Sequence, residues 1–195
     1  MTGDLSLLAA RLALGLGYAS HGAQKAFGWF DGPGPQGAAK FMQSLGLKPG
    51  EQYATLASYG ELAAGTLIAL GLGGPLGPAM LLSGMVVAET TVHAKNGFYA
   101  GGNGMEVGML YSAGALALAA SGYGELSLDH VLGWRKSLRN PLLTALALAG
   151  GIAAGYAVLA KRDTSPPDGT LATPTVAGNR ARNGTAGSKP SPAAS

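Results

Sequence analysis

The sequence of 195 residues contains no cysteine. This absence excludes disulfide bonds, thiolate metal sites and thiol-disulfide catalysis. Flavin, nicotinamide and P-loop fingerprints are also missing, because the glycine pairs fall in apolar runs or turns and not between a strand and a helix. Neither a Ser-His-Asp arrangement nor an H-E-x-x-H motif is found. If electrons pass through this protein, their carrier is therefore a bound ligand or a partner protein.

Charged residues are scarce as well. They make up 12% of the chain, whereas hydrophobic residues make up 47%. Soluble proteins contain about 25% charged residues, so the depletion indicates a membrane protein. Residues 163–195 are dominated by Pro, Ser, Thr, Ala and Gly, a composition that builds no core and predicts a disordered tail. The net charge of +3 comes largely from the tail and loops, so a nucleic-acid partner is not expected.

Five apolar runs are long enough for a helix to cross about 30 Å of hydrocarbon at about 1.5 Å per residue. Their glycines favour close packing between membrane helices. The first run has no basic residue before it and carries Arg11 inside it, so we interpret it as a retained span and not as a secretory signal. The predicted fold class is all-α, a polytopic membrane protein with a four-helix transmembrane bundle, a fifth transmembrane helix and the tail. The runs are residues 5–27, 53–72, 75–94, 105–121 and 141–160.

The predicted domains follow from these runs: a four-helix membrane domain at 1–133, an interfacial segment with the fifth span at 134–162, and the disordered tail at 163–195. If the spans alternate in direction, the first ends on a side that we name side B, and the opposite side is side A. Basic residues near the span ends favour side B as cytoplasmic.

Most polar residues of the four spans fall in the half of the bundle near side B. Ionisable groups in a bilayer are costly and normally face each other or a wet cavity. The sequence therefore predicts one polar cavity near side B. Its candidate ligand-binding residues are His21, Gln24, Lys25, Tyr59, Glu61, Glu89, His93 and Glu106.

The spacing places these side chains in pairs on the same helix face, since His21 and Lys25 are four residues apart, as are Glu89 and His93. Alternatively, each residue serves as a polar contact between helices, and the Lys25 side chain extends to the membrane–water interface. A metal site is less favoured, because helical di-iron sites use Glu-x-x-His at three residues, not four. We assign no metal ligand and no catalytic residue from the sequence.

Several motifs together resemble the DoxX family of small bacterial membrane proteins. The resemblance covers about residues 5–133 and implies a four-helix membrane core. Relatives in this family include the membrane subunit of an archaeal thiosulfate:quinone oxidoreductase and a mycobacterial subunit thought to assemble with redox-defence proteins. The fifth run and the tail depart from the pattern. The motifs are "ARLALGLGYASHGAQKAFGWF", "FMQSLGLKP", "ELAAGTLIALGL", "MVVAETTVHAKNGF", "GGNGMEVGML" and "GYGELSLDHVLG".

Three functional classes remain open. The first is a redox-associated subunit of the plasma membrane whose cavity binds a quinone, with His21 or Lys25 polarising a carbonyl and Glu61 or Glu89 relaying protons. The second is a small transporter or proton pathway, which requires polar residues that also reach side A. The third is a non-catalytic assembly subunit. Expected partners are membrane lipid and redox proteins, with a homo-oligomer left open.

Overall fold

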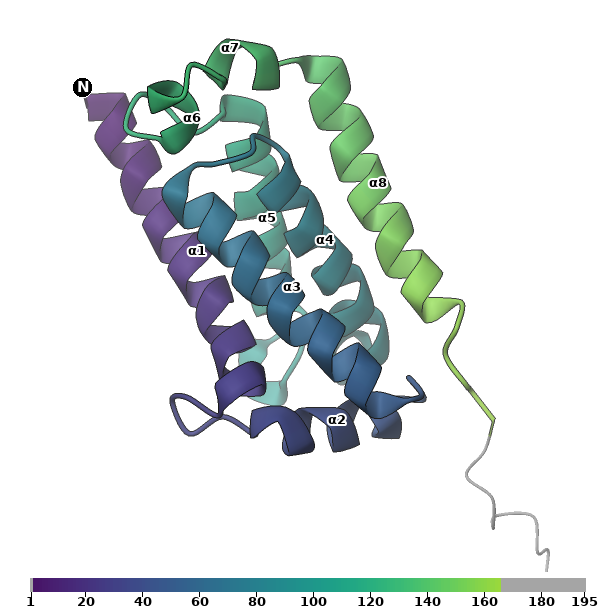
Figure 1. Cartoon of the computed structure of the whole chain (residues 1–195). Coiled ribbons are helices and arrows are strands. Elements are labelled where there is room, and N and C mark those ends of the chain that lie inside the picture. Colours follow the sequence, from purple (N-terminus) through teal and green to yellow (C-terminus); the bar gives the residue numbers. More distant parts are fainter. Residues whose placement is uncertain (1, 166–195) are drawn as a thin grey trace, which may run out of the picture. The chain divides into compact units, whose positions relative to one another are not determined.

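The computed structural model describes residues 2–165, and the chain divides into two units, Met1–Thr164 and Ser165–Ser195. All regular structure between residues 2 and 165 is helical (Figure 1), so the all-α class is confirmed for this part of the chain. Most of the predicted tail, from residue 166 onward, lies outside the described residues.

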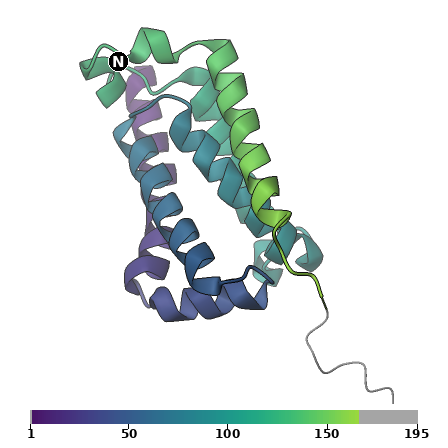
Figure 2. The same ribbon diagram turned by 45° about the vertical axis from the view of Figure 1, so that its right-hand side comes forward.

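Four helical runs form an antiparallel bundle, with each run opposite in direction to the one before it (Figures 1 and 2). The third run begins as α4 and continues directly into the π-helix η1. These runs begin and end within a few residues of the predicted spans. They are α1 (Thr2–Phe27), α3 (Gly50–Leu70), α4 (Leu76–Ala88) with η1 (Glu89–His93), and α5 (Glu106–Ser121).

Shorter helices cover the two ends of the bundle. At side B, α2 (Gly34–Ser44) lies across the ends of α1 and α3 (Figure 1). The 3-10 turns η2 (Ala94–Asn96) and η3 (Ala100–Gly102) belong to the α4–α5 connection. At side A, the single-turn helices α6 (Leu128–Val131) and α7 (Arg135–Leu138) follow α5, and α7 falls in the interfacial segment predicted from residue 134.

Helix α8 (Pro141–Leu159) is the one described helix that is long and apolar enough to cross a membrane by length and composition. The apolar helix α5 is shorter, at 16 residues, which corresponds to about 24 Å. Crossing of the membrane by all four bundle runs therefore stays a prediction.

Proline and glycine set the helix ends that the sequence indicated. Pro49 precedes α3, and Gly71 ends it in the left-handed conformation with φ of 67°, which glycine adopts without steric cost. Asn140 caps α8, because its side-chain oxygen accepts hydrogen bonds from the backbone N–H groups of Leu142 and Leu143. These local signals explain why the boundaries were predictable.

Glycines bring α1 and α3 into backbone contact. A Cβ atom at Gly15 would lie 2.5 Å from Ala69 N and 2.5 Å from Gly65 O. A Cβ atom at Gly22 would lie 2.5 Å from Ser58 O. Close helix packing through Gly15 and Gly65, as the sequence suggested, is confirmed.

Helix α8 packs along α4 and ends at side B (Figure 1). There Asp163 N donates to Gly46 O at 2.8 Å, and Lys48 Nζ lies 2.9 Å from Asp163 Oδ2. The guanidinium of Arg162 also donates to Leu45 O. The end of α8 is therefore fastened to the connection between α2 and α3.

Gly151→Val is expected to weaken the docking of α8, because a Cβ atom at Gly151 would overlap the Ala79 carbonyl group. Overpacking of this kind costs about 1–3 kcal/mol, so the purified protein should melt several degrees lower. The neighbouring Gly150→Val is the control, because a Cβ atom there meets nothing within 4 Å. Equal melting temperatures of the two variants would contradict the packing of α8 on α4.

Candidate functional site

An ion pair between α1 and α3 is the best-defined part of the predicted site. Lys25 Nζ lies 2.5 Å from Glu61 Oε2 and also donates to the backbone oxygen of His21 at 3.4 Å. The two side chains are only 22% and 15% exposed. The two charges of this largely buried pair compensate each other. Truncating one side chain therefore leaves the other charge unpaired in an apolar environment.

Two tyrosines continue the polar surface from this ion pair toward the middle of the bundle. The His21 ring stands edge-on to Tyr111 of α5, with 6.1 Å between ring centroids. Tyr111 in turn contacts the buried Tyr18, with 5.7 Å between centroids. Both hydroxyl groups lie within electrostatic range of the Glu61 carboxylate.

Sequence reasoning did not assign Tyr18 or Tyr111 to the site. The signal for Tyr18 was present, because it lies three residues before His21 and therefore on the same helix face. Tyr111 comes from a helix far along the chain, and its distance to α1 depends on how the bundle closes. Here that approach is close, since a Cβ atom at Gly17 would lie 2.7 Å from the Tyr111 hydroxyl.

Two predicted residues near side B make other contacts. Gln24 Nε2 donates to Phe30 O at 3.4 Å and so contacts the connection that follows α1. Tyr59 is 54% exposed and meets the ring of Phe27 edge-on, with 6.4 Å between centroids. Gln24 therefore contacts the connection between α1 and α2, and Tyr59 contacts the exposed ring of Phe27.

Glu89 is placed against α5 from the first position of the π-helix. Both of its carboxylate oxygens are covered and have no hydrogen-bond partner. The space for this carboxylate exists because Gly108 has no side chain; a Cβ atom at Gly108 would collide with Glu89 Oε1. His93 is close enough to interact with its charge. Buried carboxylates without partners are expensive in an apolar environment, and π-helical turns are frequent at functional sites.

His93 and Glu106 both hold the glycine-rich connection between η1 and α5. His93 Nδ1 lies 2.9 Å from Asn103 O, and Glu106 Oε2 accepts a hydrogen bond from Ala100 N at 2.9 Å. Asn96 Nδ2 also donates to Asn103 O at 3.2 Å. These contacts fasten the connection onto the side-B end of the bundle.

The predicted residues thus form two groups in the described part of the chain. Lys25 pairs with Glu61 one turn from His21, which contacts Tyr111, whereas Glu89, His93 and Glu106 lie at η1 and the start of α5. Gln24 and Tyr59 belong to neither group. Between residues 2 and 165, no three His, Asp or Glu side chains are arranged to hold a metal ion.

An apolar groove runs between α1 and α5 on the side-A half of the bundle. Its volume is about 310 Å³, within the range of about 300–1,000 Å³ that is typical of small-molecule sites. Its side-B end is formed by Leu14 and Gly114. One helical turn further, at Gly17 and Tyr111, the surface becomes polar. The groove is lined by Leu7, Ala10, Ala13, Leu14, Gly114, Ala117, Leu118 and Ser121.

A second polar cluster at side A was not predicted as a site. Arg11 is 1% exposed, donates through Nη2 to Leu126 O, and lies over the Tyr123 ring with Cζ 5.8 Å from its centroid. Asp129 accepts hydrogen bonds of 2.8 Å from Gly73 N and Gly74 N. An arginine inside an apolar run was the sequence signal; Tyr123 and Asp129 come from the segment after α5, which folds over the end of α1.

The family model DoxX matches residues 6–94, which comprise most of α1 and all of α2, α3, α4 and η1. Residues 6–94 of this chain belong to the DoxX family. The protein is therefore a small membrane protein of DoxX type, in agreement with the resemblance of its motifs. No curated protein and no solved structure matches the chain. The DoxX match contains the Lys25–Glu61 pair, His21 and Glu89, whereas Glu106 and Tyr111 lie beyond it.

Proposed function

We propose that this DoxX protein is a multi-pass plasma-membrane subunit that binds a quinone along the seam between α1 and α5. The observation that carries the proposal is the continuity of this seam. An apolar groove for an isoprenoid tail ends one helical turn, about 5 Å, before Tyr111 on α5 and two turns before His21 on α1, and these two side chains suit a polar ring. The Lys25–Glu61 pair lies one turn beyond His21.

The proposal includes four spans formed by α1, α3, α4 with η1, and α5, and a fifth formed by α8. Exposed aromatic rings near both ends of the bundle support this arrangement, because Trp and Tyr gather at membrane interfaces. Trp29 and Tyr59 are exposed near side B, and Trp134 is exposed at side A.

A quinone supplies the redox chemistry, and its reduction takes up two electrons and two protons. In this proposal His21 and the Tyr111 hydroxyl donate hydrogen bonds to a carbonyl oxygen of the ring. Glu61, paired with Lys25, holds and passes on a proton, and Glu89 with His93 continues toward side B. The electrons come from a redox partner protein, because the chain contains no cofactor fingerprint of its own.

The alternative of a small transporter or proton pathway gains one observation, the polar cluster of Arg11, Tyr123 and Asp129 at side A. The core between this cluster and the Lys25–Glu61 pair is apolar, however. Apart from Tyr18 and Tyr123 at its two ends, it is formed by Ala64, Ile68, Leu81, Ala115 and Leu118. A continuous polar path is therefore not supported, and the quinone-binding subunit remains the better proposal.

Ala117→Phe is expected to reduce bound quinone at least fivefold, because the added ring fills the groove between α1 and α5. Mass spectrometry of lipophilic molecules that co-purify with the detergent-solubilised protein measures the quinone-to-protein ratio. Ala113→Phe is the control, since Ala113 is also exposed on α5 but does not line the groove. His21→Ala should lower the ratio as well.

Absence of quinone from well-folded wild-type protein would contradict the proposal and favour an assembly subunit. Quinone binding in the groove would also be contradicted if Ala117→Phe retained as much quinone as Ala113→Phe, since the groove would then not hold the tail.

A further inference from the structure

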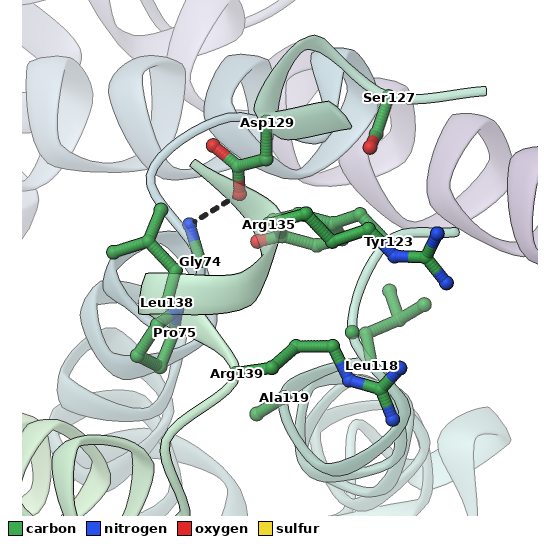
Figure 3. A pocket seen from close by; sticks show the side chains of 11 residues that line it. Gly74, Pro75, Leu118, Ala119, Tyr123, Ser127, Asp129, Arg135, Leu138 and Arg139 are labelled. Atoms are coloured by element: carbon green, nitrogen blue, oxygen red, sulfur yellow. Dashed lines mark hydrogen bonds between the residues drawn. The ribbon is translucent and has the colours of Figure 1, made fainter. Parts of the chain in front are cut away.

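A small cavity at side A lies under α6 and α7, next to the side-A end of the groove between α1 and α5, with which it shares Leu118. Its volume is about 20 Å³, enough for about one water molecule or a single anionic oxygen. Figure 3 shows the Arg135 and Arg139 side chains extending in the same direction on either side of Leu118. The cavity is lined by Gly74, Pro75, Leu118, Ala119, Gly122, Tyr123, Ser127, Asp129, Arg135, Leu138 and Arg139.

Tyr123 provides an unused hydrogen-bond donor in the cavity wall. The residue is 4% exposed, and its hydroxyl group has no hydrogen-bond partner. Burial, together with the nearby Asp129 carboxylate, raises the pKa of the Tyr123 hydroxyl above its ordinary value. The hydroxyl therefore keeps its proton and can donate a hydrogen bond to an acceptor. A buried donor without an acceptor is energetically costly.

The one carboxylate in the lining is already engaged. Both oxygens of Asp129 accept backbone hydrogen bonds, one from Gly73 and one from Gly74 (Figure 3 draws the second). Asp129 thereby holds the turn between α3 and α4, and its charge is partly offset by these donors. It repels an anion less than a free carboxylate would.

Positive charge surrounds the cavity. The Arg135 guanidinium is 3.7 Å from Glu125, whose side chain is 63% exposed, so this pair is weak. No ion pair of Arg139 is found between residues 2 and 165, and its aliphatic stem packs on Gly122. Behind the Tyr123 ring, Arg11 Nε and Nη1 have no hydrogen-bond partner.

The place of the cavity in the fold indicates the source of an anion. Arg139 comes two residues before Pro141, where α8 begins, and Trp134 is exposed beside Arg135. Helix α8 is suited by length and composition to span a membrane, and in that arrangement this loop lies at the level of the lipid headgroups. The cavity is too small for a whole phosphate group, so such a group would sit at its mouth with one oxygen inside.

We propose that the side-A cavity binds the phosphate of an acidic phospholipid between Arg135 and Arg139, with one phosphate oxygen accepting a hydrogen bond from Tyr123. Paired guanidinium groups suit this role, since arginine recognises phosphate with two parallel hydrogen bonds. The site depends on α8 lying in the membrane and not on quinone binding in the groove between α1 and α5.

Native mass spectrometry of the full-length protein in detergent, titrated with phosphatidylglycerol, tests the site. Wild-type protein is expected to retain one phosphatidylglycerol at least tenfold better than phosphatidylcholine. The double variant Arg135→Gln/Arg139→Gln should lose this preference, and Tyr123→Phe should weaken it severalfold. Lys136→Gln is the matched control, because Lys136 is exposed on the same short helix but does not line the cavity.

Equal losses in Lys136→Gln and in the double arginine variant would overturn the proposal, because binding would then reflect general attraction to a basic loop. If inorganic phosphate at equal concentration displaced phosphatidylglycerol, the proposal that the bound phosphate group belongs to a lipid would be overturned. The site would then be assigned to the free anion. Melting temperatures of the variants show that they are folded, since Arg135 and Arg139 are not in the core.

Discussion

Gly15→Val is expected to destabilise the bundle by at least about 3 kcal/mol and to leave little folded protein. The added side chain would enter the backbone of α3 at Gly65 and Ala69, where the Ala69 Cα atom is also only 2.9 Å from the new Cβ. Backbone atoms cannot move aside as a flexible side chain can, so α1 and α3 must separate along their whole contact. Overpacking usually costs about 1–3 kcal/mol, and this position is at the severe end of that range.

Gly60→Val is the control for this prediction. Gly60 is in the middle of α3, so it shares the change in helix propensity, but a Cβ atom there meets nothing within 4 Å. Size-exclusion profiles and thermal melting in detergent measure the difference. A Gly15→Val protein as stable as Gly60→Val would mean that α1 and α3 do not cross at Gly15.

Lys25→Ala is expected to lower stability by about 2 kcal/mol, the second largest effect we expect of a single substitution. The reason is the Glu61 carboxylate, which is 15% exposed and would lose its partner at 2.5 Å. Breaking a fully buried pair costs about 3–5 kcal/mol, and the remaining exposure of this pair reduces the figure. Thermal unfolding in detergent, compared with Lys40→Ala on the exposed face of α2, gives the measurement.

The double variant Lys25→Met/Glu61→Leu separates stability from function. Replacing a buried ion pair by apolar residues is often neutral for stability, so this protein should melt near the wild-type temperature. It should nevertheless bind less quinone, because the polar end of the seam is removed. If the double variant were less stable than Lys25→Ala alone, the pair would not compensate its charges in the way described.

Much of the fold was predictable because its signals are local. The apolar runs, the prolines at positions 49 and 75, and the glycine that ends α3 mark where helices begin and end. Alternating direction then placed His21, Lys25 and Glu61 near side B. The two single-turn helices after α5 were harder to predict, since four-residue helices have no periodicity to detect.

The arrangement of the site depends on contacts between distant segments. Nothing local in the sequence tells which of the nearby polar groups Lys25 selects, and the structure pairs it with Glu61, 36 residues away. Asp129 binds the turn at Gly73 and Gly74, more than 50 residues earlier. Tyr111 reaches His21 only because Gly17 leaves room for its hydroxyl. Such pairings follow from packing and not from spacing.

Photolabelling with an azido-quinone would show whether the α1–α5 seam holds a quinone. The full-length protein in membranes would be labelled, digested and sequenced by mass spectrometry. We predict label on residues 7–21 of α1 and 111–121 of α5, suppressed by an excess of unmodified quinone and absent from Ala117→Phe. Label that falls mainly on α2 or α8, or that unmodified quinone does not suppress, would contradict quinone binding in this seam.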